Sequence, residues 1–184
     1  MKRRVTQPGT DPLLGGLAAG DERAYEALYD RFGATLYRIA LGILGQPSDA
    51  EDAVQETFAS VYRSRRRLPL VRDLKSYLLA ALRRAASRVA AARDAASRPQ
   101  LDPMGQRGPI DPADLGDRLE GALAALPLEQ REVIALKVDG GFTFAEIAEV
   151  TGVSPNTAAS RYRYALERLR ERLGGPDSGG TCHG

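Results

Sequence analysis

The sequence has no tryptophan, and its 184 residues include only four phenylalanines and seven tyrosines. Leucine and alanine must therefore supply most of the packing, and both residues favour helices. The single cysteine, Cys182, excludes an internal disulfide. It stands beside His183 in a glycine-rich segment, and two ligands are too few to hold a metal ion. We therefore expect a helical protein without a metal site or a cofactor.

Long apolar runs are also missing. No stretch approaches the roughly 20 apolar residues that a membrane-spanning helix needs. No apolar run follows the basic residues at the start, as one would in a secretory signal. Hydrophobic residues still make up 43% of the chain, which is an ordinary share for a globular protein. These observations predict a soluble, cytoplasmic protein that does not contact the membrane.

Negative charge is almost absent from one segment. Between Arg63 and Arg93 the only acid is Asp73, whereas the net charge of the whole chain is just +2. Helix faces that serve only solubility usually mix both signs. The imbalance therefore favours binding to a polyanion over a plain solvated face. The basic residues of the segment are Arg63, Arg65, Arg66, Arg67, Arg72, Lys75, Arg83, Arg84, Arg88 and Arg93.

Apolar residues recur at helical spacing in two blocks, 12–93 and 115–173. Residues 94–114 lack this periodicity and contain four prolines, which is typical of a flexible linker. Residues 1–11 and 174–184 are polar or glycine-rich, and we expect both ends to be disordered. The predicted fold is thus all-α, with two small helical domains joined by a flexible linker.

Helix boundaries in the first block are predicted from capping residues. Asp21 can cap a helix that ends near Gly45. Ser48 and Glu51 have the spacing of a capping box, which predicts that the next helix starts at Ser48. A further helix is expected over about Asp73 to Ala92.

The second block contains the pattern of a helix-turn-helix over residues 142–173. Thr143 and Glu146 predict a capping box, and Gly152 stands where the first helix must stop in a left-handed conformation. Ser154 can cap the second helix, with Pro155 at its first position. The exposed side of that helix would carry hydrogen-bonding and basic groups suited to a DNA major groove. An amphipathic hairpin with a merely polar face is the simpler alternative.

Acidic and amide side chains are concentrated on one helix of the first block. Asp49, Asp52 and Glu56 share a face, opposite Val54 and Phe58. Paired carboxylates can serve catalysis or bind a metal, but no histidine or cysteine lies near them. A solvated face is the default for any single acid. Their concentration instead favours a docking surface for a basic partner.

Three segments resemble the sigma-70 family of bacterial RNA polymerase subunits, specifically its extracytoplasmic-function (ECF) group. "DAEDAVQETFASVYR" resembles the polymerase-binding helix of the family, and "LLGGLAAGDERAYEALYDRF" resembles its opening helices. "LPLEQREVIALKVDGGFTFAEIAEVTGVSPNTAASRYRYALERLR" resembles its promoter-reading domain. The resemblance implies a factor that binds core polymerase and directs promoter-specific transcription initiation, and not an enzyme.

The resemblance also assigns roles to residues. The acidic helix would bind the beta-prime clamp helices of the polymerase core, the basic segment would hold and open the minus-10 element, and the helix-turn-helix would read the minus-35 element. A contact between the C-terminal domain and the beta flap is expected, and such factors are often held by an anti-sigma factor. The residues implied are Asp49, Glu51, Asp52, Gln55 and Glu56 for core polymerase; Arg63, Arg66, Arg83, Arg84 and Arg88 for the minus-10 element; and Asn156, Thr157, Ser160, Arg161, Arg163 and Tyr164 for the minus-35 element.

The sequence departs from the family pattern at several of these positions. Tyr62 and Tyr77 stand where tryptophan is usual, Arg84 replaces a common asparagine, and Ala159 replaces a common lysine. Two other functions are weighed. A stand-alone helix-turn-helix regulator would explain the second block only. A recombinase-like enzyme would need a nucleophile or metal site, for which we find no spacing.

Overall fold

The computed structural model describes residues 11–96 and 114–174, and every regular element within them is helical. This confirms the all-α prediction. Both predicted disordered ends, apart from Asp11 and Gly174, and most of the predicted linker lie outside the described residues. None of the described helices combines the length and apolar character needed to cross a bilayer.

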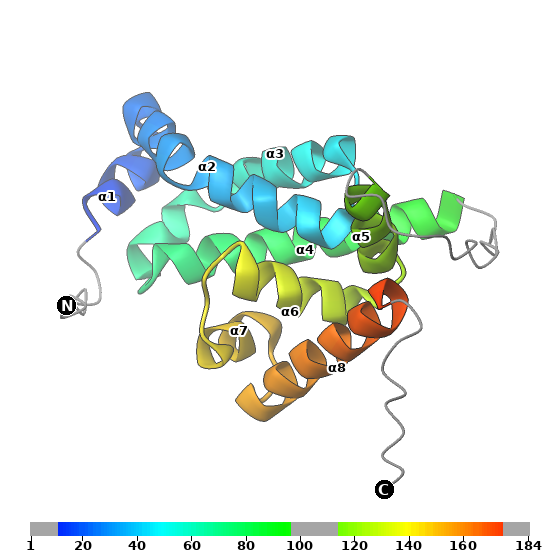
Figure 1. Cartoon of the computed structure of the whole chain (residues 1–184). Coiled ribbons are helices and arrows are strands. Elements are labelled where there is room, and N and C mark those ends of the chain that lie inside the picture. Colours follow the sequence, from blue (N-terminus) through cyan, green and yellow to red (C-terminus); the bar gives the residue numbers. More distant parts are fainter. Residues whose placement is uncertain (1–10, 97–113, 175–184) are drawn as a thin grey trace, which may run out of the picture.

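Two groups of helices follow each other along the chain (Figure 1). We call the first group the N-terminal unit and the second the C-terminal unit. The N-terminal unit consists of α1 (Pro12–Ala19), α2 (Glu22–Leu44), α3 (Pro47–Arg63), the 3₁₀ helix η1 (Arg65–Leu70) and α4 (Leu74–Ala96). The C-terminal unit consists of α5 (Asp114–Ala124), α6 (Leu128–Val138), α7 (Phe144–Thr151) and α8 (Pro155–Leu173).

Capping residues set the ends of α2 as predicted. The carboxylate of Asp21 accepts a hydrogen bond from the Arg23 N–H (3.1 Å), so it satisfies one of the free donors of the first turn. The helix ends at Leu44, and Gly45 follows with φ of 73°, a left-handed conformation that glycine adopts without strain.

The predicted capping box at Ser48 is wrong. The helix α3 begins one residue earlier, with Pro47 at its first position, and the preceding Gln46 makes no side-chain capping bond. Proline suits that position because its ring fixes φ and because the N–H it lacks would have no partner there. Ser48 therefore already lies inside the first turn.

The basic helix α4 is longer than predicted. It starts at Leu74, where Asp73 accepts hydrogen bonds from the backbone N–H groups of Lys75 (3.1 Å) and Ser76 (3.2 Å). It continues to Ala96, beyond the expected end at Ala92 and into the first residues of the predicted linker. Its alanine-rich sequence supports this extension because alanine has the highest helix propensity.

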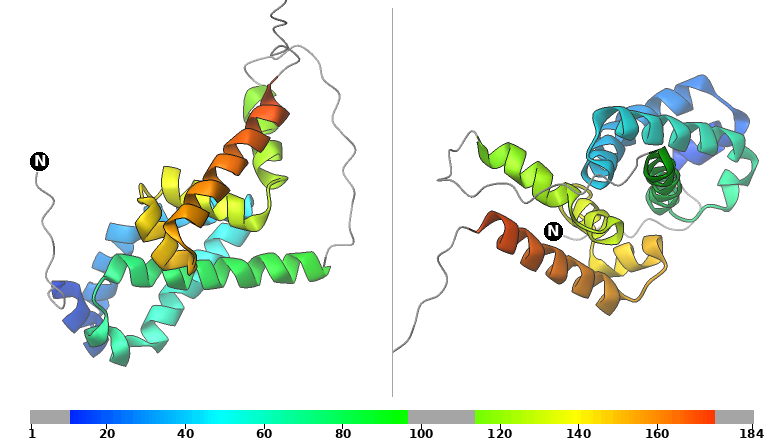
Figure 2. Two further views of the ribbon diagram at one scale, coloured as in Figure 1. Left: turned by 90° about the horizontal axis from the view of Figure 1, so that it is seen from below. Right: turned by 90° about the vertical axis from the view of Figure 1, so that its right-hand side faces the viewer.

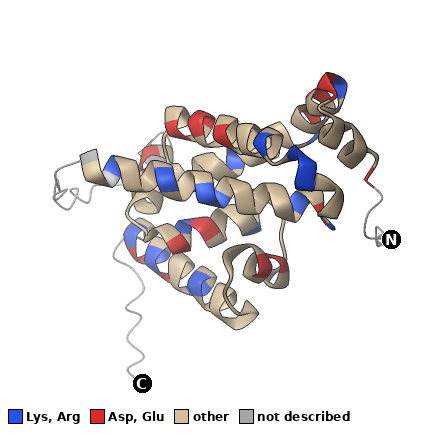
Figure 3. Ribbon diagram, turned by 180° about the vertical axis from the view of Figure 1, so that it is seen from behind, with Lys and Arg blue, Asp and Glu red and all other residues tan. Residues whose placement is uncertain are grey.

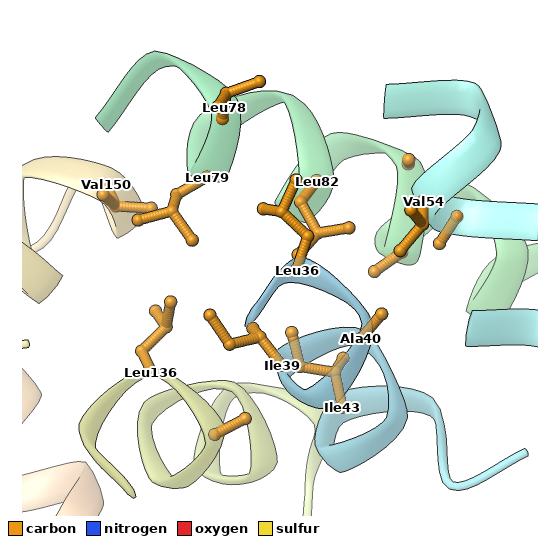
Figure 4. Close-up of a cluster of buried hydrophobic side chains, with 14 of the residues drawn as sticks. Leu36, Ile39, Ala40, Ile43, Val54, Leu78, Leu79, Leu82, Leu136 and Val150 are labelled. Atoms are coloured by element: carbon orange, nitrogen blue, oxygen red, sulfur yellow. The ribbon is translucent and has the colours of Figure 1, made fainter. Parts of the chain in front are cut away.

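The two units pack directly against each other, with α6 on α2 and α7 on α4 (Figure 2). Buried side chains from both units form one continuous apolar cluster. Leu36 and Ile39 of α2, Leu79 of α4, Leu136 of α6 and Val150 of α7 all belong to it (Figure 4). A second, smaller cluster joins α5 to α8 and contains Ala122, Leu126, Ala165 and Leu169.

Candidate nucleic-acid interface

The helices α7 and α8 have the local geometry of a helix-turn-helix. The Thr143 hydroxyl accepts from the Glu146 N–H (3.3 Å) and the Glu146 carboxylate accepts from the Thr143 N–H (2.7 Å), which confirms the capping box. Gly152 ends α7 with φ of 72°. The Ser154 hydroxyl accepts from the Thr157 N–H (3.0 Å) and starts α8. The turn is therefore fixed from both sides.

The inner face of α8 is buried and its other side is largely free. Ala158, Ala165 and Leu169 are buried, and the Tyr162 ring packs on Phe144 with 5.7 Å between centroids. Of the predicted minus-35 residues, Asn156, Thr157, Arg163 and Tyr164 are exposed, whereas Ser160 and Arg161 are half-buried.

The predicted polymerase-binding residues of α3 fall into two groups. Glu51, Asp52 and Gln55 are exposed. Asp49 and Glu56 instead make ion pairs with arginines of the same unit: Asp49 with Arg93 (3.4 Å), and Glu56 with Arg63 (2.6 Å) and Arg88 (3.2 Å). Figure 3 shows the acidic positions gathered on α3 and the basic ones spread along α4.

A groove between α2 and α3 borders Glu51, one of the exposed acids. Its lining includes the aromatic rings of Tyr29, Tyr37 and Phe58, together with Glu51 and Gln55. The Tyr29 and Phe58 rings contact each other with centroids 5.3 Å apart, and Tyr29 is 60% exposed. An apolar groove beside carboxylates can accept a helix that carries both apolar and basic side chains.

Four of the five predicted minus-10 arginines are exposed on η1, on α4 and at the end of α3. They are Arg63, Arg66, Arg84 and Arg88. The structure brings Arg63 and Arg88 together, because both bind the same carboxylate of Glu56. Glu56, which was predicted to bind polymerase, thus also positions two of the predicted DNA-binding groups.

Arg83 is the exception, because it lies between the two units. Its Nε donates to Glu132 Oε1 of α6 at 2.6 Å, and Glu132 is only 5% exposed. Burial raises the pKa of Glu132 above its ordinary value, while the nearby Arg83 and Arg161 act in the opposite direction. Sequence reasoning missed Glu132. It could have been found from its position four residues from both Leu128 and Leu136, which places a charged residue in the apolar stripe of α6.

The fold and these surfaces define a helical transcription protein of the sigma-70 class. The family model "Sigma-70 region 2" matches residues 28–96, and "Sigma-70, region 4" matches residues 116–169. The chain belongs to the ECF RNA polymerase sigma factors.

Relatives of known name support this membership. The chain is 32% identical over 174 residues to the ECF sigma factor SigK of Mycolicibacterium vanbaalenii, and the aligned region covers 89% of each protein. It is 31% identical to the ECF sigma factor SigL of Mycobacterium tuberculosis, and the aligned region covers 87% of this chain and 94% of SigL.

Solved structures share the fold. CnrH, solved in complex with the cytosolic domain of CnrY, superposes with a TM-score of 0.66 and 24% identity, covering 88% of this chain and 94% of CnrH. The sigma factor RpoE of Bartonella quintana, solved with the anti-sigma factor NepR, gives a TM-score of 0.57 over 80% of this chain and 97% of RpoE.

As a member of this family, the protein is an RNA polymerase sigma factor that directs transcription initiation, and the resemblance read from the sequence is confirmed. Sigma factors are transcription initiation factors. The alternative of a stand-alone helix-turn-helix regulator is not favoured, because the region 2 match accounts for most of the N-terminal unit, which a regulator would leave unexplained.

Proposed function

We propose that three separate surfaces of this sigma factor divide the work of initiation. The exposed acids of α3 bind the beta-prime clamp helices of core polymerase, the arginines of η1 and α4 hold the minus-10 element, and the N-terminal part of α8 reads the minus-35 element. The observation that carries the proposal is the separation of charge between α3 and α4 (Figure 3).

The acidic surface suits a basic protein partner. Glu51 and Gln55 are exposed and line the groove between α2 and α3, so apolar contact and charge complementarity are available at one place, and Asp52 is exposed next to Glu51 in the sequence. Opposite charges across an interface speed association and exclude wrong partners. The resemblance to the sigma-70 family also supports a contact between the C-terminal unit and the beta flap of core polymerase.

The basic surface suits single-stranded and duplex DNA. Arg66, Arg84 and Arg88 are exposed, and the Arg65 guanidinium lies over the Tyr62 ring at 4.4 Å. Strand opening requires cations for the freed backbone and aromatic surfaces for unstacked bases. Tyr62 is 49% exposed and provides such a surface.

The recognition surface on α8 suits the major groove. Asn156 and Thr157 lie in its exposed first turn, where a helix in the groove contacts base edges. Arg161 and Arg163 would add contacts to phosphates, which raise affinity without reading sequence.

We further infer that the chain is not itself an enzyme and that it works in the cytoplasm. A sigma factor supplies recognition, and the catalysis belongs to core polymerase. The RpoE chain was solved with an anti-sigma factor, which supports an anti-sigma factor as a partner of this chain too.

Run-off transcription with core polymerase tests the proposal. Core polymerase alone and core polymerase with this chain are compared on a pool of genomic promoter fragments. We expect the chain to produce transcripts from one promoter class. Equal transcription with and without the chain over the whole pool would refute the proposed function.

A further inference from the structure

A single carboxylate oxygen joins two arginines of the N-terminal unit. Glu56 Oε1 accepts a hydrogen bond from Arg63 Nη2 at 2.6 Å and another from Arg88 Nη2 at 3.2 Å. Arg63 lies on α3 like Glu56, whereas Arg88 belongs to α4, which packs along α3. Two guanidinium groups repel each other. The carboxylate between them is therefore what allows the two arginines to lie together.

The three charged groups are open to solvent and thus to an approaching polyanion. The side chains of Arg63 and Arg88 are 59% and 64% exposed, and that of Glu56 is 36% exposed. Ion pairs at such exposure are weak because water solvates both charges well and because pairing costs side-chain freedom. A second anion that reaches the two guanidinium groups can therefore displace Glu56.

A DNA phosphate has the chemistry to take the place of this carboxylate. Like a carboxylate, it accepts charge-assisted hydrogen bonds from arginine. An arginine that neutralises a DNA phosphate also releases condensed counterions, which favours binding further. The proposed function assigns Arg63 and Arg88 to the minus-10 element. Glu56 and the backbone of that element would then bind the same donors.

We propose that Glu56 occupies the place of a minus-10 phosphate in the DNA-free chain and competes with DNA for Arg63 and Arg88. DNA binding must break both ion pairs, and it leaves the carboxylate close to the phosphate that replaces it. Glu56 therefore lowers the affinity of the chain for DNA. The inference rests on the proposed function, because that function assigns both arginines to DNA.

Competition outweighs any help that Glu56 gives in positioning the arginines. Arg88 Nε also donates to the backbone oxygen of Arg84 (3.3 Å), so Arg88 keeps one anchor when Glu56 is lost. The ion pairs themselves are exposed and hold their side chains only weakly. Removing the negative charge of Glu56 should therefore strengthen DNA binding rather than weaken it.

Binding of the full chain to single-stranded DNA tests the proposal. The probe is a fluorescently labelled oligothymidine of about 20 nucleotides, which is long enough for a single-strand site. Phosphate contacts carry no base information, so the promoter sequence is not needed. Glu56→Gln removes the charge and keeps the size of the side chain. We expect fluorescence anisotropy to show binding about fivefold tighter than that of the unmodified chain.

A matched control separates this effect from the change in net charge. Glu26→Gln makes the same substitution at an exposed position on α2. It should leave the affinity within about twofold of the unmodified chain. None of the substituted side chains is buried, and circular dichroism should show every variant to be folded.

A double-mutant cycle shows whether the gain comes through the arginines. Arg63→Ala and Arg88→Ala are combined, with and without Glu56→Gln. Without the two guanidinium groups Glu56 has no partner to withhold from DNA. Glu56→Gln should then change the affinity by less than about twofold, whereas it gives the full gain when both arginines are present.

Three results would overturn the inference: equal affinities of Glu56→Gln and Glu26→Gln, weaker binding of Glu56→Gln, or a gain that persists without the arginines. The proposed function fails in a different way. If the double arginine variant bound the oligonucleotide and supported run-off transcription like the unmodified chain, the arginines would not hold the minus-10 element. If that variant lost binding while Glu56→Gln gained none, only the competition by Glu56 would be wrong.

Discussion

The acidic side chains of α3 differ in what they contact within the chain. Asp49 and Glu56 are tied to Arg93, Arg63 and Arg88, whereas Asp52 is exposed. Changing Glu56 would therefore disturb Arg63 of α3 and Arg88 of α4 as well as any protein partner. A substitution at Asp52 tests the polymerase contact without that complication.

We predict that Asp52→Arg weakens binding to core polymerase at least tenfold, which is about 1.4 kcal/mol. The change reverses charge at the proposed dock but touches no buried group, so the melting temperature should stay within a few degrees. Glu22→Arg makes the same reversal at an exposed position at the start of α2 and should bind normally. A pull-down with purified core measures both, and equal retention of the two variants would exclude Asp52 from the dock.

Glu132 makes stability depend on pH in a definite direction. Burial raises its pKa above the ordinary value of 4.5, with Arg83 and Arg161 opposing and Glu129 adding to the rise. A carboxyl with a raised folded-state pKa contributes stability below its unfolded pKa, and this contribution is lost as pH rises through the folded value. Glutamine remains neutral at every pH, so a chain with glutamine at position 132 does not lose this contribution to stability.

We therefore predict that Glu132→Gln gains free energy of unfolding relative to the unmodified chain as pH rises above about 4.5. Urea unfolding from pH 4 to 8 measures the difference, with Glu26→Gln at an exposed position on α2 as the control. If the advantage shrank with rising pH, attraction by Arg83 would outweigh burial and the direction of the shift would be wrong.

At the scale of elements, α8 is the part whose function is most directly testable. Arg161→Ala removes one proposed phosphate contact. The slope of log affinity against log salt should fall by about 0.9, and affinity should fall about eightfold at 0.1 M salt. Titration of the minus-35 duplex with assembled holoenzyme measures both. Arg172→Ala, near the far end of α8, should change neither. A salt slope that stays constant in Arg161→Ala would rule out the phosphate contact.

Helix ends were predictable where a side chain satisfies the backbone locally. Thr143, Ser154 and Asp21 all cap as their sequence context indicated. The start of α3 was misplaced because two local signals competed there, and Pro47 prevailed over Ser48. Exposure on α8 was predictable from its periodicity except at Ser160, which is half-buried.

At the scale of the whole molecule, the packing of one unit on the other could not be predicted. It depends on residues far apart in sequence, such as Arg83 and Glu132 or Gly42 and Ala135. Periodicity shows which face of each helix is apolar but not which helix covers it. The apolar side of α2, for example, packs in part against α6 of the other unit.

The crossing of α2 and α6 yields a prediction about how the two units are held together. Gly42→Leu adds a side chain where even a Cβ would press on Ala135, yet leucine favours the helix by up to about 1 kcal/mol over glycine. The N-terminal unit should stay folded while the units separate. Hydrogen exchange should then quicken in α6 and remain slow in α3 and α4. Gly15→Leu, on α1 with open space around it, should change neither. Unaltered protection of α6 in Gly42→Leu would mean that this contact does not hold the units together.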